Sequence, residues 1–92
     1  MEKEWKGFIE LSSKLRSKED FVRFFDLFLT KTERKALAAR FLVIKALLEG
    51  KGTHREIAEK FSVSPAFVAR GQKALEKTAP DLRKFLKGNL PK

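Results

Sequence analysis

The 92-residue chain has no cysteine and only five glycines and three prolines. Without thiols it can form no disulfide and no cysteine-ligated metal site, which fits a reducing compartment. No stretch approaches the roughly 18 consecutive apolar residues of a membrane-spanning helix. The start MEKEWKGF also has no signal-peptide layout. We therefore expect a soluble, cytoplasmic protein with no membrane partner.

The side chains needed for enzymatic chemistry are also scarce. His54 is the only histidine, and no cysteine or second histidine is available to complete a nucleophile–base pair or a metal-ligand set. The sequence therefore predicts no catalytic residue, no metal site and no enzymatic activity.

Positive charge, in contrast, is abundant, with a formal net charge of +9. Residues 50–92 carry 10 basic and 4 acidic residues, net +6, whereas residues 1–49 carry 11 and 8, net +3. A basic C-terminal half indicates a polyanionic partner. Charge alone is equally compatible with DNA, RNA, an anionic membrane or simple solubility.

Apolar residues recur with helical periodicity along the whole chain, and no segment alternates like a strand. Starts of helices are marked by the capping boxes Thr30–Glu33 and Thr53–Glu56 and by the pair Ser64-Pro65. The sequence predicts one all-α domain over 1–92, with helices over about 2–16, 19–29, 30–50, 53–61, 64–77 and 78–88.

The segment from Phe21 to Leu29 is apolar around nearly its whole circumference. Such a helix must be buried on several sides, and a chain this short cannot supply the cover by itself. A second copy of the chain is the simplest supplier, so we expect a homodimer. The N-terminal aromatic residues then form dimer core rather than a base-stacking platform.

Residues 53–75 read as a short helix, a tight turn and a second helix. The apolar residues that pack such a hairpin are present: Ile57, Ala58, Phe61, Val63 and Val68. Together with the local positive charge, this pattern favours a DNA-binding helix-turn-helix over a generic helical hairpin in an interaction module.

Five short segments, taken together, form a further pattern: LFLTKTERKALAAR (27–40), LLEG (47–50), RE (55–56), ARGQKAL (69–75) and LRKFL (82–86). In this combination the chain resembles the Trp repressor family. The resemblance implies an intertwined all-helical homodimer of six-helix chains. It assigns residues 1–29 and 78–88 to dimerisation, 30–50 to a long central helix, and 53–77 to the helix-turn-helix.

The resemblance also implies a ligand, L-tryptophan, that sets the position of the helix-turn-helix as a corepressor. Its indole would lie between the guanidinium groups of Arg40 and Arg70, and Arg70 would also meet the carboxylate. Leu27 and Leu29 of the partner subunit would offer backbone carbonyls to the ammonium group, with Thr30 beside them. Gly71 would leave space against the ring.

Two positions depart from the family pattern: Phe67 replaces a small polar residue, and Ala74 replaces a serine that contacts the ligand amino group. Phe67 and Ala74 share one helix face with Arg70. The Phe67 ring can stack on the ligand or on Arg70, or it can fill the pocket without any ligand. The corepressor is therefore expected to be L-tryptophan, with an indole-type analogue and constitutive, ligand-independent DNA binding as alternatives.

DNA contacts follow from the same pattern. A dimer presents two recognition helices to successive major grooves, which predicts a near-palindromic operator. Phosphate contacts are expected from His54, Arg55, Lys73 and the amides at the Ser64-Pro65 helix start. Arg55 is also the best candidate for a direct, bidentate contact with a guanine base. Pro65, Ala66 and Ala69 can offer only apolar contacts or room for water, so specificity would rest on water and groove shape.

Overall fold

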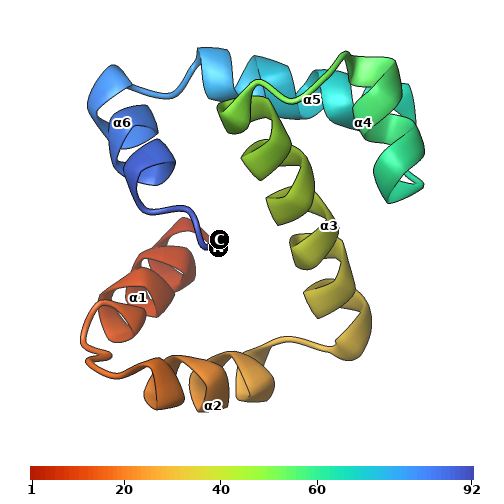
Figure 1. Ribbon diagram of the computed structural model, residues 1–92. Coiled ribbons are helices and arrows are strands. Elements are labelled where there is room, and N and C mark those ends of the chain that lie inside the picture. The colour runs from red at the N-terminus through yellow and green to blue at the C-terminus, as the bar shows by residue number, and fades with distance from the viewer. The chain divides into compact units, whose positions relative to one another are not determined.

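A computed structural model describes all 92 residues, and every regular element is a helix. The helices are α1 (Glu2–Ser12), α2 (Lys18–Phe28), α3 (Lys31–Glu49), α4 (His54–Phe61), α5 (Pro65–Glu76) and α6 (Pro80–Gly88) (Figure 1). The predicted all-α class and the six helices are confirmed. The chain divides into two compact units, Met1–Arg34 and Lys35–Lys92, which are described one at a time.

The N-terminal unit is built around aromatic contacts between α1 and α2. The ring of Phe8 lies 5.4 Å from that of Phe24 and 5.2 Å from that of Phe28, centroid to centroid. Trp5 stacks on Phe8 at 5.7 Å. Yet neither helix contains a buried residue, and Trp5 remains 58 % exposed. In a single chain this unit has contacts between rings but no enclosed core.

Helix α1 ends earlier than predicted, at Ser12 instead of residue 16. The hydroxyl groups of Ser12 and Ser13 donate to the carbonyl oxygens of Ile9 and Glu10, at 2.9 and 2.7 Å. Serine side chains that bond the preceding turn compete with the helical ladder, which explains the early end. The periodicity of apolar residues could not show this, because it continues to Leu15.

The predicted starts of α3, α4 and α5 are confirmed by their capping bonds. Thr30 Oγ1 accepts the Glu33 amide at 3.1 Å, and Glu33 Oε1 accepts the Thr30 amide at 2.9 Å. Thr53 and Glu56 repeat this arrangement with the same distances, and Ser64 Oγ accepts the Phe67 amide. Each capping box thus satisfies amides that a helix start would otherwise leave without partners.

Helix α6 begins at Pro80, two residues after the predicted start at Thr78. The Thr78 hydroxyl does not cap it but donates to the carbonyl of Ala74 at 2.8 Å, at the end of α5. Proline at the first helical position has no amide that needs a partner, and no side chain caps α6.

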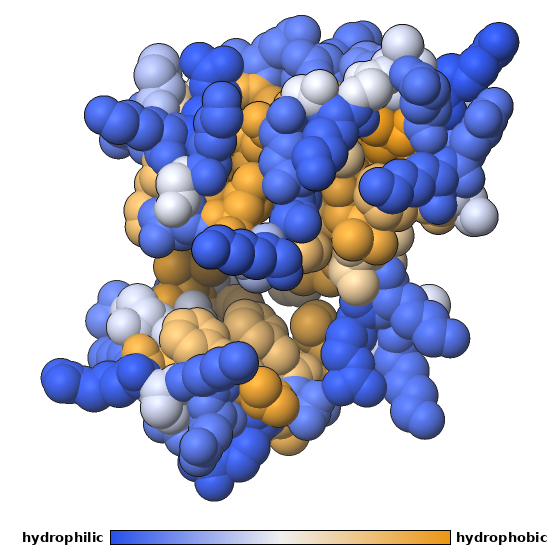
Figure 2. Space-filling model, viewed as in Figure 1, coloured by the Kyte–Doolittle hydropathy of each residue, from blue (hydrophilic) through white to orange (hydrophobic).

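The C-terminal unit has a small core where α3, α4 and α5 meet. Its buried residues are Val43, Ala46, Ile57, Ala58 and Val68, with Leu47, Phe61, Val63 and Phe67 packed around them. All five residues predicted to pack the hairpin are among these. Ser62 closes α4 in the left-handed conformation, with φ 55°, at the place where a glycine is more usual. Apolar side chains also reach the surface among hydrophilic ones (Figure 2).

Candidate functional site

A cavity of about 210 Å³ lies between α3 and α5. It is lined by Arg40, Val43 and Ile44 of α3 and by Phe67, Arg70, Gly71 and Ala74 of α5. On each helix these positions are three or four residues apart and so share one face. The structure therefore brings five of the expected ligand-site residues together in the C-terminal unit: Arg40, Phe67, Arg70, Gly71 and Ala74.

The two arginines of the cavity are free to bind a ligand. Both side chains are exposed, and neither forms a salt bridge within the chain. The remaining walls are hydrocarbon, from Val43, Ile44 and the Phe67 ring. Two unpaired planar cations beside apolar walls suit a flat aromatic molecule that carries an anionic group.

Phe67 and Arg70 are also neighbours of each other. The Arg70 Cζ atom lies 6.0 Å from the centroid of the Phe67 ring, at the outer limit of a cation–π contact. Phe67 is half-buried and packs against the core of the hairpin. Phe67 is also one of the residues that line the cavity.

Gly71 allows α5 to approach α3 closely. A Cβ atom at this position would lie 3.3 Å from Val43 Cγ1 and 3.4 Å from Leu47 Cδ1. The residue lines the cavity as expected, and the contact that its missing side chain permits is with α3 itself. Ala74, which is exposed, lines the same cavity with a methyl group and no hydroxyl.

The other three expected ligand residues, Leu27, Leu29 and Thr30, belong to the N-terminal unit. Leu27 is 77 % exposed, and no amide of the chain donates to the carbonyl oxygens of Leu27 and Leu29. The Thr30 hydroxyl is engaged as the cap of α3. Two carbonyl acceptors are therefore available at this turn, and their assignment to a partner subunit's ligand stays a prediction.

The expected DNA contacts lie on the hairpin of α4 and α5. His54, Arg55, Ser64, Pro65, Ala66 and Lys73 are exposed, and Ala69 is half-buried. Because the Ser64 cap takes the Phe67 amide, the first free N–H of α5 is that of Ala66. No basic residue from Lys51 onward forms a salt bridge, so these cations are available to an external polyanion.

Two cavity residues, Val43 and Ile44, were not predicted from the sequence. They stand three and four residues after Arg40 and so share its helix face, which is the signal that could have identified them. No group of histidine, cysteine or acidic residues is arranged to hold a metal ion. None of the helices combines the length and apolar character needed to cross a membrane.

Comparison with known proteins identifies the family of the chain. The Trp repressor protein family matches residues 3–90. A Trp operon repressor homolog of Chlamydia caviae is 48 % identical over 83 residues, covering 90 % of this chain and 82 % of the relative. Homologs of Chlamydia trachomatis serovar D and Photobacterium profundum are 45 % and 32 % identical, over 89 % and 97 % of this chain and 87 % and 86 % of their own lengths. The chain thus belongs to the Trp repressor family, a family of transcriptional repressors and not of enzymes.

Proposed function

We propose that the chain acts as a homodimeric, ligand-gated repressor that binds a near-palindromic operator with L-tryptophan as corepressor. The observation that carries this proposal is that Arg40 of α3 and Arg70 of α5 line one cavity with apolar walls. As a DNA-binding repressor it would act in the cytoplasm.

The chemistry of L-tryptophan suits this cavity. The indole places its two faces against guanidinium planes, and its edges against Val43, Ile44 and Phe67. The ligand carboxylate makes a charge-assisted contact with Arg70. Since Ala74 offers no hydroxyl, the ammonium group depends on the free carbonyls of Leu27 and Leu29 of the partner subunit.

Gating follows from the position of the ligand between two helices. Arg40 belongs to the central helix, and Arg70 to the helix that would enter the major groove. A ligand held by both fixes the tilt of α5 relative to α3. The gain in operator affinity cannot exceed the difference in ligand affinity between the two positions of α5.

Recognition of DNA is supported by the exposed hairpin. Arg55 near the start of α4 can contact a guanine or a phosphate, and Lys73 and the Ala66 amide can contact phosphates. The small side chains of Pro65, Ala66 and Ala69 let the start of α5 approach the groove closely, and leave space for bridging water.

Dimerisation is supported by the N-terminal unit, whose helices α1 and α2 have no buried residue. Exposed aromatic and aliphatic side chains on this scale mark an interface. A second chain would enclose these side chains. Residues 1–92 of each chain would then form one domain of an intertwined pair.

A second candidate function is constitutive DNA binding, in which the Phe67 side chain takes the place of the ligand. The 6.0 Å approach of Arg70 to the Phe67 ring favours it, because a cation–π contact of this kind could hold α5 without a guest.

The proposal is tested by fluorescence-anisotropy titration of an operator duplex, selected in vitro, with and without L-tryptophan. We expect L-tryptophan to tighten binding at least about fivefold, the lower end of usual allosteric coupling. Arg70→Leu should abolish this response, while Arg83→Leu on α6 should keep it. Equal operator affinity with and without L-tryptophan would exclude gating and favour constitutive binding.

A further inference from the structure

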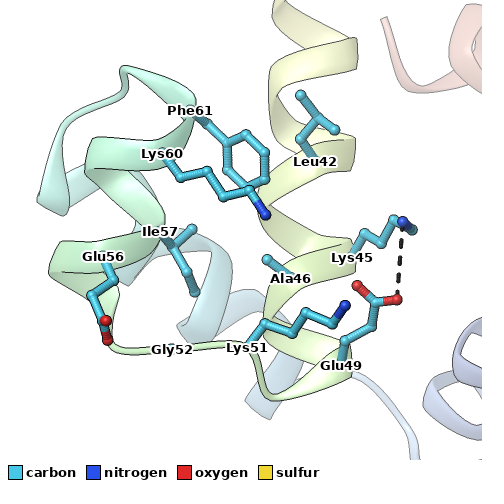
Figure 3. Close-up of a pocket in the computed structure, with 10 residues that line it drawn as sticks. All are labelled: Leu42, Lys45, Ala46, Glu49, Lys51, Gly52, Glu56, Ile57, Lys60 and Phe61. Carbon is cyan, nitrogen blue, oxygen red and sulfur yellow. Dashed lines mark ion pairs between the residues drawn. The ribbon is translucent and has the colours of Figure 1, made fainter.

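A second and larger cavity, of about 500 Å³, opens between α3 and α4 (Figure 3). It shares no residue with the cavity of Arg40 and Arg70. On α3 it uses the face of Leu42, Lys45, Ala46 and Glu49, whereas the first cavity uses Arg40, Val43 and Ile44. The central helix thus carries two separate cavities on two of its faces.

The floor of this second cavity is apolar. Leu42 and Ala46 of α3 line it together with Ile57 and Phe61 of α4, and Figure 3 shows the Phe61 ring directed toward α3. Ile57 and Ala46 are buried members of the hairpin core, while Leu42 is 40 % exposed. The rim of the cavity therefore leaves hydrocarbon accessible to a ligand.

The charges around this floor are unbalanced in favour of cations. Glu49 pairs with Lys45 at 3.9 Å, and Glu56 accepts the Thr53 amide at 2.9 Å in the capping box of α4. Both carboxylates of the cavity are thus engaged. Lys51 and Lys60 have no carboxylate within 4 Å.

Of the two free ammonium groups, that of Lys60 lies against the apolar floor. Lys60 Nζ lies 5.5 Å from the centroid of the Phe61 ring, so its charge stays over the apolar surface. Lys51 stands between Gly50 and Gly52, whose φ angles are +66° and +92°. A Cβ at position 52 would lie 3.3 Å from Glu56 Oε1, so the Glu56 side chain lies close against the Gly52 backbone on this side of the rim.

We propose that the α3–α4 cavity is a binding site for a small organic anion with a flat apolar body, of the aromatic carboxylate class. The body would cover Phe61 and Leu42, and the carboxylate would bind Lys51 and Lys60. Inorganic phosphate or a DNA phosphate would pair with the ammonium groups but leave the apolar floor in water, so the floor selects against both.

An occupant of this site touches both the central helix and the first helix of the hairpin. It could therefore bias the hairpin position from the face opposite to α5, provided that its affinity differs between hairpin positions. The site does not depend on whether L-tryptophan binds between Arg40 and Arg70.

The test is an NMR titration of isotope-labelled full-length protein with 2-naphthoate, with and without saturating L-tryptophan. We expect amide shifts around Leu42, Ala46, Lys51 and Lys60 in both series. The double variant Lys51→Gln/Lys60→Gln, which removes both charge-assisted contacts to the carboxylate, should weaken binding at least about tenfold. The matched variant Lys84→Gln/Lys87→Gln, which removes the same charge from α6, should leave the affinity unchanged.

Neutral 2-naphthamide has the same ring system as 2-naphthoate but no negative charge. It therefore tests the contribution of the carboxylate alone, and we expect it to bind at least severalfold more weakly. Equal affinity for the amide, an unchanged affinity in the Lys51/Lys60 variant, or no shift around the cavity would overturn the proposal. So would shifts confined to the Arg40–Arg70 cavity, or the same shifts produced equally by inorganic phosphate or by duplex DNA. Failure of L-tryptophan to bind would affect only the function proposed above.

Discussion

Phe67 and Arg70 stand three residues apart on α5 and line the same cavity. A small polar side chain at position 67 would leave Arg70 to meet a ligand alone. The phenyl ring instead places its centroid 6.0 Å from Arg70 Cζ and adds an apolar wall to the cavity. We expect the balance between the Phe67–Arg70 contact and the added apolar wall to decide whether the cavity binds a ligand.

The substitution Phe67→Leu separates the two effects. Leucine keeps an apolar side chain against the hairpin core but removes the aromatic face. If Phe67 is a wall of the ligand site, L-tryptophan affinity should fall about threefold to tenfold, the usual size of one lost stacking or cation–π contact. If the ring competes with the ligand, affinity should rise. Calorimetric titration of the variant and the wild type distinguishes these outcomes, and circular dichroism checks that the variant is folded.

The expected partners of Arg70 could be named from the sequence only through the family resemblance. Arg40 is a lone charge in an apolar run, and such an arginine is ordinarily explained by a stem on the apolar face and a head in water. Nothing in the periodicity shows that it shares a cavity with Arg70. The packing of α5 against α3, which Gly71 permits, brings the two together.

At the scale of the helices, side chains that bond to the backbone made the starts of α3, α4 and α5 predictable. Thr30, Thr53 and Ser64 each cap the helix that the sequence assigned to them. The end of α1 was harder to predict, because it depends on hydrogen bonds from the Ser12 and Ser13 hydroxyl groups to the preceding turn. The α3–α4 cavity was not predictable at all, since it depends on how the Gly50–Gly52 turn sets α4 beside α3.

The two capping boxes predict a loss of stability in acid. Backbone and side-chain hydrogen bonds from Thr30 and Thr53 lower the pKa of Glu33 and Glu56 below the ordinary value of 4.5. A carboxyl whose folded-state pKa is lowered stabilises the fold fully above its unfolded value, and that contribution is lost as pH falls through the folded-state pKa. The melting temperature should therefore drop as the pH is lowered below about 4.5.

Thermal unfolding followed by circular dichroism between neutral pH and pH of about 3 measures this effect. The double variant Glu33→Gln/Glu56→Gln keeps a side-chain acceptor for each cap and should show a flatter pH profile. Glu59→Gln, whose carboxylate caps no helix, is the control and should follow the wild type. Identical profiles for all three proteins would contradict the role of the capping boxes.

At the scale of the whole molecule, the buried residues are distributed unevenly between the two units. All six buried residues belong to the C-terminal unit, and α1, α2 and α6 have none. The N-terminal aromatic contacts alone leave Trp5, Phe21 and Phe28 between 41 and 58 % exposed. A second chain covering these rings would supply the missing core.

Val22, 55 % exposed on α2, tests this requirement. We expect the wild type to sediment as a dimer and to melt at a higher temperature as its concentration rises. Val22→Glu, which would place a charge in the dimer core, should shift the protein toward monomer at the same concentration. Lys18→Gln lowers the charge by the same amount at a polar position of α2 and should remain dimeric. A wild type that is monomeric in sedimentation at micromolar concentration would refute the dimer.

Calorimetric titration with L-tryptophan tests most directly whether two guanidinium groups form its binding site. We expect each wild-type chain to bind one L-tryptophan, and we expect Arg40→Leu to weaken this binding at least about tenfold. Arg83→Leu, which removes a guanidinium group from α6, should leave the affinity unchanged. Two results would contradict a binding site formed by two guanidinium groups. One is a wild type that gives no binding heat at any accessible concentration or temperature, and the other is an Arg40→Leu variant with undiminished affinity.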